Sequence, residues 1–176
     1  MKTTKYRYLI QQYKNNIYGY SLYMMKNQMD ADDVTQEVMI RIWKNLENFK
    51  FTSAKSWIMK TTHNLCIDFL RKNAVAAGRL YEIDDVFEET YSDNKEDNNP
   101  FIKVHLKMMS EKLKDAIQRL PEKLKNVLVL YELQGLRYNE IASVLNIPVN
   151  SVKVYLFRAR KKLQEELNHY EPQEVI

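Results

Sequence analysis

Apolar residues recur at helical spacing along the N-terminal half of the chain, and they predict three helices. Residues 8–26, rich in Tyr, Ile, Leu and Met, form the first helix and supply part of a core. A second helix is expected to start at Asp30, because acidic residues favour a helix N-terminus. Its apolar stripe falls on every fourth residue, at Val34, Val38, Ile42 and Leu46. A third helix is expected over residues 53–72, with Ser53 or Ser56 as its cap.

In the C-terminal half, residues 141–163 predict two short helices joined by a tight turn. The first of them shows its apolar face in Ile141, Ala142 and Leu145. Asn146 tolerates the left-handed backbone conformation that such a turn needs. Pro148 lacks an N–H and restricts the residue before it, so it cannot continue the first helix.

The second of these helices concentrates positive charge. Asn150 or Ser151 is expected to cap it. Its apolar side is formed by Val152, Leu156 and Leu163. Its cations, with no acid among them, are Lys153, Arg158, Arg160, Lys161 and Lys162. This pattern is typical of a helix-turn-helix, which places its second helix in the DNA major groove. A helical hairpin that binds nothing is the alternative.

Composition supports a mostly helical chain, since only 3 Gly and 4 Pro occur among 176 residues. No apolar run approaches the roughly 18 residues that span a bilayer. The N-terminal residues lack the apolar core of an export signal. Cys66 is the only cysteine, so an internal disulfide or a cysteine-based metal site is excluded, and we expect its side chain to be buried. A cytoplasmic protein is therefore expected.

The net charge of +4 is unevenly distributed. Residues 1–78 carry 12 basic and 6 acidic side chains, residues 79–99 carry 2 and 8, and residues 100–176 carry 13 and 9. The two basic flanking segments could bind a polyanion such as nucleic acid, whereas the acidic middle segment would repel one. Residues 82–100 lack apolar periodicity, which predicts a linker with little structure of its own. This linker is either a solvated spacer or a segment whose acidic side chains mimic nucleic acid and occupy a basic channel.

The third predicted helix combines two kinds of side chain. Its apolar contacts are expected from Trp57, Ile58, Leu65, Phe69 and Leu70. Its polar side carries cations, amides and hydroxyls, at Lys55, Lys60, Thr61, His63, Asn64, Asp68, Arg71 and Lys72. Such a mixture near aromatic rings suits single-stranded nucleic acid. Trp57 is either a core anchor, which we prefer, or a stacking platform. His63 has no second His or Cys nearby, so no metal site is expected.

Two segments carry a family resemblance. DADDVTQEVMIRIWKNLENFK followed by SWIMKTTHNLCIDFLRK closely resembles region two of bacterial sigma factors. LPEKLKNVLVLYELQGLRYNEIASVLNIPVNSVKVYLFRARKKL resembles their region four. The order of the two motifs, the acidic linker and the short length are similar to those of the extracytoplasmic-function (ECF) group, which keeps only these two regions.

The resemblance implies an all-α chain of two small helical domains joined by a flexible acidic linker. Residues 1–74 would bind core RNA polymerase and recognise and melt the −10 element. Residues 75–104 would form the linker. Residues 105–170 would hold the helix-turn-helix that recognises the −35 element.

Site residues follow from the same resemblance. The second helix would dock on core polymerase through Asp33, Gln36, Glu37 and Arg41, because a carboxylate pair and an amide suit charge-assisted bonds to arginines. The loop before Trp57, expected over residues 49–55, would hold a flipped base. Contacts to the −10 element would come from Phe51, Ser53, Lys55, Trp57, Lys60, Thr61, Asn64, Asp68, Arg71 and Lys72. Contacts to the −35 element would come from Asn150, Ser151, Lys153, Tyr155, Arg158 and Lys161, with Arg160 and Lys162 bound to phosphates or solvated.

Two positions depart from the family pattern. Arg137 stands where the family often has a capping Ser or Thr, so we expect the cap to move to Asn139 or the helix start to fray. Thr35 stands where an apolar residue is common, which would slightly weaken the docking helix.

The sequence therefore predicts a transcription initiation factor that directs core RNA polymerase to promoters and promotes strand opening. It would perform no chemistry, use no cofactor or metal, and be restrained by an anti-sigma protein. One alternative is a helix-turn-helix regulator that binds duplex DNA without polymerase. An enzyme is disfavoured, because no phosphate-cradling glycine loop or paired catalytic carboxylates occur.

Overall fold

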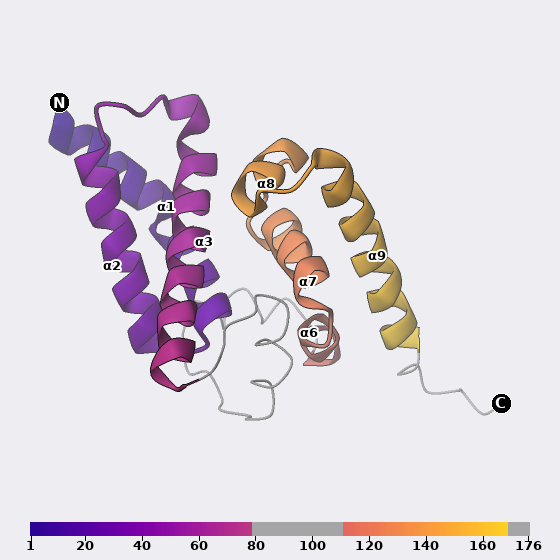
Figure 1. Ribbon diagram of the computed structural model, residues 1–176. Coiled ribbons are helices and arrows are strands. Elements are labelled where there is room, and N and C mark those ends of the chain that lie inside the picture. Colours follow the sequence, from indigo (N-terminus) through magenta and orange to yellow (C-terminus); the bar gives the residue numbers. More distant parts are fainter. Residues whose placement is uncertain (79–110, 169–176) are drawn as a thin grey trace. The chain divides into compact units, whose positions relative to one another are not determined.

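The computed structural model describes residues 1–78 and 111–168, and within them all regular elements are helices (Figure 1). The elements are α1 (Lys2–Met25), α2 (Gln28–Lys44), α3 (Phe51–Ala76), α6 (Glu111–Gln118), α7 (Glu122–Leu128), the π-helical segment η1 (Val129–Leu133), α8 (Tyr138–Leu145) and α9 (Val149–Asn168). The all-α prediction is confirmed. The chain forms two compact units, one around α1, α2 and α3 and the other around α6, α7 and α9. The predicted linker lies outside the described residues except for its first four positions.

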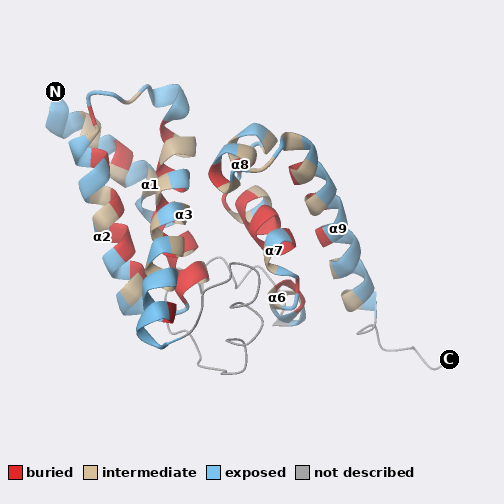
Figure 2. Ribbon diagram, viewed as in Figure 1, coloured by how far each residue is buried: buried red, intermediate tan, exposed pale blue. Residues whose placement is uncertain are grey.

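The N-terminal unit is a three-helix bundle, and the predicted apolar stripe of α2 lies in its core (Figure 2). Val34, Val38, Ile42 and Leu46 are all buried. α1 contributes Leu9, Ile17, Tyr20, Leu22 and Met24, and α3 contributes Ile58, Met59 and Cys66. The expected burial of Cys66 is confirmed. Thr35 is also buried, and its hydroxyl donates to the carbonyl of Ala31 at 2.7 Å, so its polar group is satisfied within the helix.

The turn between α1 and α2 corrects the predicted start of the second helix. Lys26 ends α1 in the left-handed conformation, with φ of 53°. Asn27 then caps α2, because its side-chain oxygen accepts from the backbone N–H of Asp30 at 3.1 Å. The helix therefore begins at Gln28, two residues before Asp30. Asp30 remains in the first turn, where its charge suits the helix dipole.

The start of α3 also differs from prediction. The helix begins at Phe51, and Lys50 occupies the cap position without a side-chain bond. Ser53 and Ser56 lie inside the helix, so neither is the cap, and the Ser53 hydroxyl donates back to the Lys50 carbonyl at 3.2 Å. The predicted loop over residues 49–55 is therefore mostly helix, and the connection from α2 to α3 spans residues 45–50.

In the C-terminal unit, the predicted turn of the helix-turn-helix is confirmed. Asn146 adopts the left-handed conformation, with φ of 54°. α9 begins at Val149, immediately after Pro148, whose carbonyl accepts from the N–H of Val152 at 3.2 Å. Asn150 and Ser151 lie within the first turn of α9, so the prediction that one of them caps the helix is wrong. Proline is common at the starts of helices because its φ is fixed near the helical value. Here α9 begins directly after Pro148, and therefore before Asn150 and Ser151.

The start of α8 is stabilised in a way that the sequence analysis did not foresee. Asn139 lies inside the helix, so it is not the cap. Instead the Glu140 carboxylate accepts from the backbone N–H of Arg137 at 2.7 Å. This is the reciprocal half of a capping box, which needs no hydroxyl at the position of Arg137. The carbonyl of Arg137 accepts from the N–H of Ile141 at 2.9 Å, so the first helical hydrogen bond is formed.

Candidate functional site

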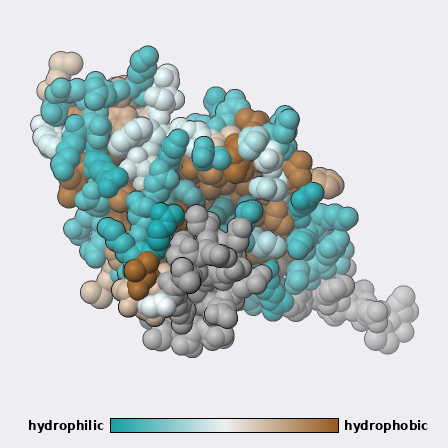
Figure 3. Space-filling model, in the orientation of Figure 1, coloured by the Kyte–Doolittle hydropathy of each residue, from teal (hydrophilic) through white to brown (hydrophobic). Residues whose placement is uncertain are grey.

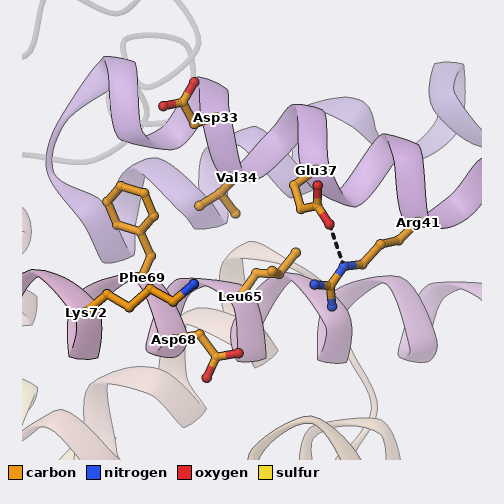
Figure 4. Close-up of a pocket in the computed structure, with 8 residues that line it drawn as sticks. All are labelled: Asp33, Val34, Glu37, Arg41, Leu65, Asp68, Phe69 and Lys72. Atoms are coloured by element: carbon orange, nitrogen blue, oxygen red, sulfur yellow. Dashed lines mark hydrogen bonds and ion pairs between the residues drawn. The ribbon is translucent and has the colours of Figure 1, made fainter.

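A groove of about 340 Å³ lies between α2 and α3 (Figure 4). The α2 residues that line it are Asp33, Val34, Glu37 and Arg41, and the α3 residues are Leu65, Asp68, Phe69 and Lys72. Three of the residues predicted to dock on polymerase therefore lie beside two that were predicted to contact the −10 element. The fourth predicted docking residue, Gln36, is exposed on α2 outside this lining.

The α2 side of the groove carries accessible charge. The Arg41 Nε atom donates to Glu37 Oε1 at 2.9 Å, and both side chains are partly exposed. An exposed pair at this spacing holds its partners weakly, so either group can exchange its partner for one on another protein. Burial raises the pKa of Asp30, and the charge of Asp33 raises it further. Negative charge thus gathers at the first turn of α2.

Leu65 and Phe69 form an apolar part of the groove lining that the sequence analysis assigned to the core. Both residues are only partly buried. Their position one turn apart on α3 places them opposite Val34 of α2 (Figure 4). The groove thereby combines an apolar floor with a charged rim, which is the common composition of a protein-binding surface.

The residues predicted to contact the −10 element all lie on α3. The exposed ones are Phe51, Ser53, Lys60, Asn64, Asp68, Arg71 and Lys72, and the partly buried ones are Lys55, Trp57 and Thr61. The later positions lie 3, 4, 7, 11, 14 and 15 residues after Trp57, so they share one side of the helix. Trp57 packs edge-on against Phe49, with ring centroids 4.6 Å apart. The α3 helix therefore presents a continuous polar strip with an aromatic pair at its N-terminal end.

His63 does not belong to this polar strip. The Tyr20 hydroxyl and His63 Nδ1 share a hydrogen bond of 2.9 Å, and Tyr20 is fully buried in α1. Burial lowers the pKa of His63 to about 4. The imidazole is therefore neutral at physiological pH and serves the contact between α1 and α3, which corrects its assignment to the nucleic-acid side.

In the C-terminal unit, α9 buries Val152, Leu156 and Ala159 and leaves its other side open. The predicted −35 contacts Asn150, Lys153, Arg158 and Lys161 are exposed, and Ser151 and Tyr155 are partly buried. The exposed four fall at spacings of three, five and three residues, which places them along the outer side of the helix.

Arg160 takes a different role from its cationic neighbours. Its Nη2 atom lies 2.7 Å from Glu132 Oε1, and its guanidinium carbon lies 5.3 Å from the ring centroid of Tyr131. Tyr131 in turn stacks on Tyr138, with centroids 5.4 Å apart. The hydrogen bond with Glu132 raises the pKa of Arg160. Arg160 therefore joins α9 to η1 in this structure, while its side chain stays about half exposed. Its predicted contact with phosphate stays a prediction.

Comparison with known proteins decides the family. The family model for Sigma-70 region 2 matches residues 9–75, and that for Sigma-70, region 4 matches residues 110–163. The ECF RNA polymerase sigma-E factor of Haemophilus influenzae is 30% identical over 90% of this chain and 85% of its own length. The ECF RNA polymerase sigma factor SigE of Mycolicibacterium smegmatis is 28% identical over 90% of this chain, which spans 60% of that relative's length.

This chain is an ECF sigma factor of the sigma-70 family. It is thus a transcription initiation factor, and its class works with core RNA polymerase on promoter DNA. The fold agrees with that of the sigma factor RpoE solved in complex with the anti-sigma factor NepR from Bartonella quintana. The TM-score is 0.65 over 92% of this chain and 96% of that one, at 18% identity.

The outer side of α9 in this sigma factor also holds two apolar residues that the sequence analysis missed. Val154 and Phe157 are 43% and 69% exposed. Phe157 lies four residues after Lys153 and next to Arg158. This spacing could have predicted from the sequence that Phe157 lies on the outer side of α9, as Val154 does. Apolar side chains on a helix in the major groove contact the methyl group of thymine, whereas the cations contact guanine or phosphate.

Within residues 1–78 and 111–168, no cluster of His, Cys, Asp and Glu is placed to hold a metal ion. Among the same residues, no helix combines the length and apolarity that crossing a membrane requires. Proteins of this family are initiation factors rather than enzymes.

Proposed function

We propose that this sigma factor docks on core RNA polymerase through the groove between α2 and α3. The observation that carries the proposal is the grouping of Asp33, Glu37 and Arg41 around an apolar floor in a single groove. Arginines on a partner helix would replace Arg41 as the partner of Glu37 and bind Asp33 as well. Leu65 and Phe69 would lose their remaining exposure to water on docking. Residues 1–74 would supply this contact and the −10 contact.

The polar strip of α3 would then meet the non-template strand of the −10 element. Its cations would follow phosphates, and Asn64 would hydrogen-bond to an exposed base edge. Trp57 and Phe49 stand at the end of the strip where the connection from α2 arrives. A base flipped from the duplex loses a few kcal/mol of stacking, which contacts of this kind would offset.

Residues 105–170 would place α9 in the major groove of the −35 element. Lys153, Tyr155 and Arg158 would read bases or clamp phosphates, with Asn150 and Ser151 near the backbone. Lys161 and Lys162 would contact phosphates. Arg160 would keep α9 in place through Glu132.

An anti-sigma protein would restrain this sigma factor by covering the groove between α2 and α3. Support comes from the likeness in fold to the Bartonella quintana sigma factor, which was solved with an anti-sigma factor bound. The protein would act in the cytoplasm, where the polymerase and its DNA are found, and it would catalyse no reaction itself. An ordinary helix-turn-helix regulator would have no use for a polymerase-docking groove.

Co-purification with core RNA polymerase tests the docking proposal. The variant Asp33→Ala should lose core polymerase, because Asp33 lines the groove. The matched control is Asp32→Ala, which removes the same side chain from an exposed α2 position outside the groove lining. The control should bind core polymerase as the unaltered chain does. Equal binding by both variants would reject the groove as the docking surface.

A further inference from the structure

Two exposed aromatic rings, one from α1 and one from α3, pack together in the N-terminal unit. Tyr8 is 54% exposed and Phe51 is 55% exposed. Their ring centroids lie 5.9 Å apart, with an angle of 73° between the planes. Figure 3 shows hydrophilic residues over much of the visible surface of this unit. An edge-to-face pair leaves part of each ring free for a further stacking partner.

Lys5 connects this pair to the aromatic pair at the start of the polar strip. Its Nζ atom donates to the carbonyls of Leu46 at 2.8 Å and Phe49 at 3.1 Å. The same atom lies 5.2 Å from the ring centroid of Phe51. Phe49 in turn packs against Trp57. The first turns of α1 therefore hold the connection between α2 and α3 in shape, and they bring Tyr8 into one surface with the α3 rings.

The charge around these rings is strongly positive. Residues 1–9 and 43–55 together hold six Lys or Arg side chains and one acidic residue, Glu47. That single carboxylate is already paired with Lys2, whose Nζ lies 3.2 Å from Glu47 Oε1. Exposed rings among surplus cations match a ligand that offers flat apolar groups on an anionic backbone, which is single-stranded nucleic acid. An acidic protein segment would match the charge but would leave the ring faces without a flat partner.

We propose that Tyr8 and Phe51 form a stacking platform for an unpaired base of the non-template strand, beside the polar strip of α3. The platform extends the −10 surface onto α1, and Tyr8 is its new member. Lys5 is a positioning residue that fixes the connection and the Phe51 ring. This inference rests on the proposed function, because the strand reaches the platform only where the promoter is opened.

The test uses holoenzyme made from core polymerase and the full chain. The probe is a fluorescein-labelled non-template oligonucleotide that covers the −10 region of a promoter mapped by run-off transcription. Tyr8→Leu should weaken binding of this strand about tenfold, because stacking on an aromatic ring is lost. Tyr8→Phe should bind within about twofold of the unaltered chain, because it keeps the ring. Since Tyr8 is more than half exposed, both variants should fold normally.

An abasic scan of the oligonucleotide locates the stacked base without altering the protein. One position should exist where removing the base weakens the unaltered holoenzyme about tenfold and leaves Tyr8→Leu unaffected. Equal binding of the strand by Tyr8→Leu and the unaltered chain would overturn the proposal. The proposal would also be overturned if Tyr8→Leu binds more weakly than the unaltered chain with every abasic oligonucleotide of the scan. A failure of the proposed function is distinct, because the unaltered holoenzyme would then fail to form or to bind the strand at all.

Discussion

The hydroxyl of Tyr20 lies 2.9 Å from Nδ1 of His63, and this contact joins α1 to α3 inside the N-terminal unit. Burial lowers the pKa of His63 to about 4, from an ordinary value of 6.5. The unfolded chain therefore takes up a proton at a higher pH than the folded chain does. Between these two pKa values the unfolded state binds more protons, so the free energy of unfolding falls as the pH falls.

The N-terminal unit should lose about 2 kcal/mol of unfolding free energy between pH 7.5 and pH 5 through His63. Both tryptophans of the chain, Trp43 and Trp57, lie in this unit, so tryptophan fluorescence in urea reports its unfolding alone. His63→Gln should lose this pH dependence, because glutamine does not titrate. Tyr20→Phe should keep it, because the burial of the imidazole remains. A His63→Gln chain with an unchanged pH dependence would show that other groups cause it.

Arg160 and Lys161 are adjacent cations with different expected roles. Arg160→Gln should lower the unfolding free energy of the C-terminal unit by about 1 kcal/mol, because the partly exposed bond with Glu132 and the ring contact with Tyr131 are lost. Lys161→Gln should leave stability unchanged and weaken holoenzyme binding to every −35 sequence alike. Its plot of log affinity against log salt should become shallower by about 1. Thermal unfolding measures the first effect and salt titration of DNA binding measures the second. A loss of stability with Lys161→Gln, together with a shallower salt dependence with Arg160→Gln, would contradict this account.

Arg158 should affect which −35 sequence the holoenzyme prefers, and it should not affect the stability of the C-terminal unit. It is exposed on the outer side of α9. If its guanidinium binds a base edge, Arg158→Ala should weaken holoenzyme binding to the preferred −35 duplex by about 1–3 kcal/mol and relax the preference at one position. Fluorescence anisotropy with a set of singly substituted duplexes measures both effects. A uniform loss over all duplexes with a shallower salt dependence would identify Arg158 as a phosphate clamp instead.

Asn64 should contribute to strand opening. Permanganate footprinting of the −10 region should show weaker thymine reactivity with Asn64→Ala holoenzyme than with the unaltered one. Asn73→Ala is the matched control, since Asn73 is exposed on α3 but lies half a turn away from Asn64 around the helix. Unchanged thymine reactivity with Asn64→Ala holoenzyme would show that Asn64 does not contribute to strand opening, and the contribution would then have to come from another residue of the polar strip.

The sequence predicted the core of α2 and the turn of the helix-turn-helix, because both depend on local rules. The stripe from Val34 to Leu46 follows from helical periodicity, and the backbone of Asn146 follows from the short side chain of Asn. Helix starts were placed too late at α1, α2, α3 and α9, and the cap of α8 was misassigned. The first helix begins at Lys2 rather than at Tyr8, and the residues that precede the starts of α2, α3 and α9 are Asn27, Lys50 and Pro148.

The parts of the site that could not be predicted depend on contacts between distant segments. His63 pairs with Tyr20, and Arg160 pairs with Glu132. Both residues have polar side chains at helical positions that look solvent-facing in the sequence alone. Lys5 bonds to carbonyls more than forty residues away, which no local pattern encodes. The roles of the docking, −10 and −35 residues remain predictions for the experiments described above.

Run-off transcription from fragmented genomic DNA tests the central claim most directly. Core RNA polymerase supplemented with this sigma factor should yield discrete transcripts that neither component yields alone. Their start sites should share two common sequence elements, upstream by about one and about three turns of the DNA helix. Transcripts unchanged by addition of the chain, together with tight duplex binding in the absence of core polymerase, would contradict the account.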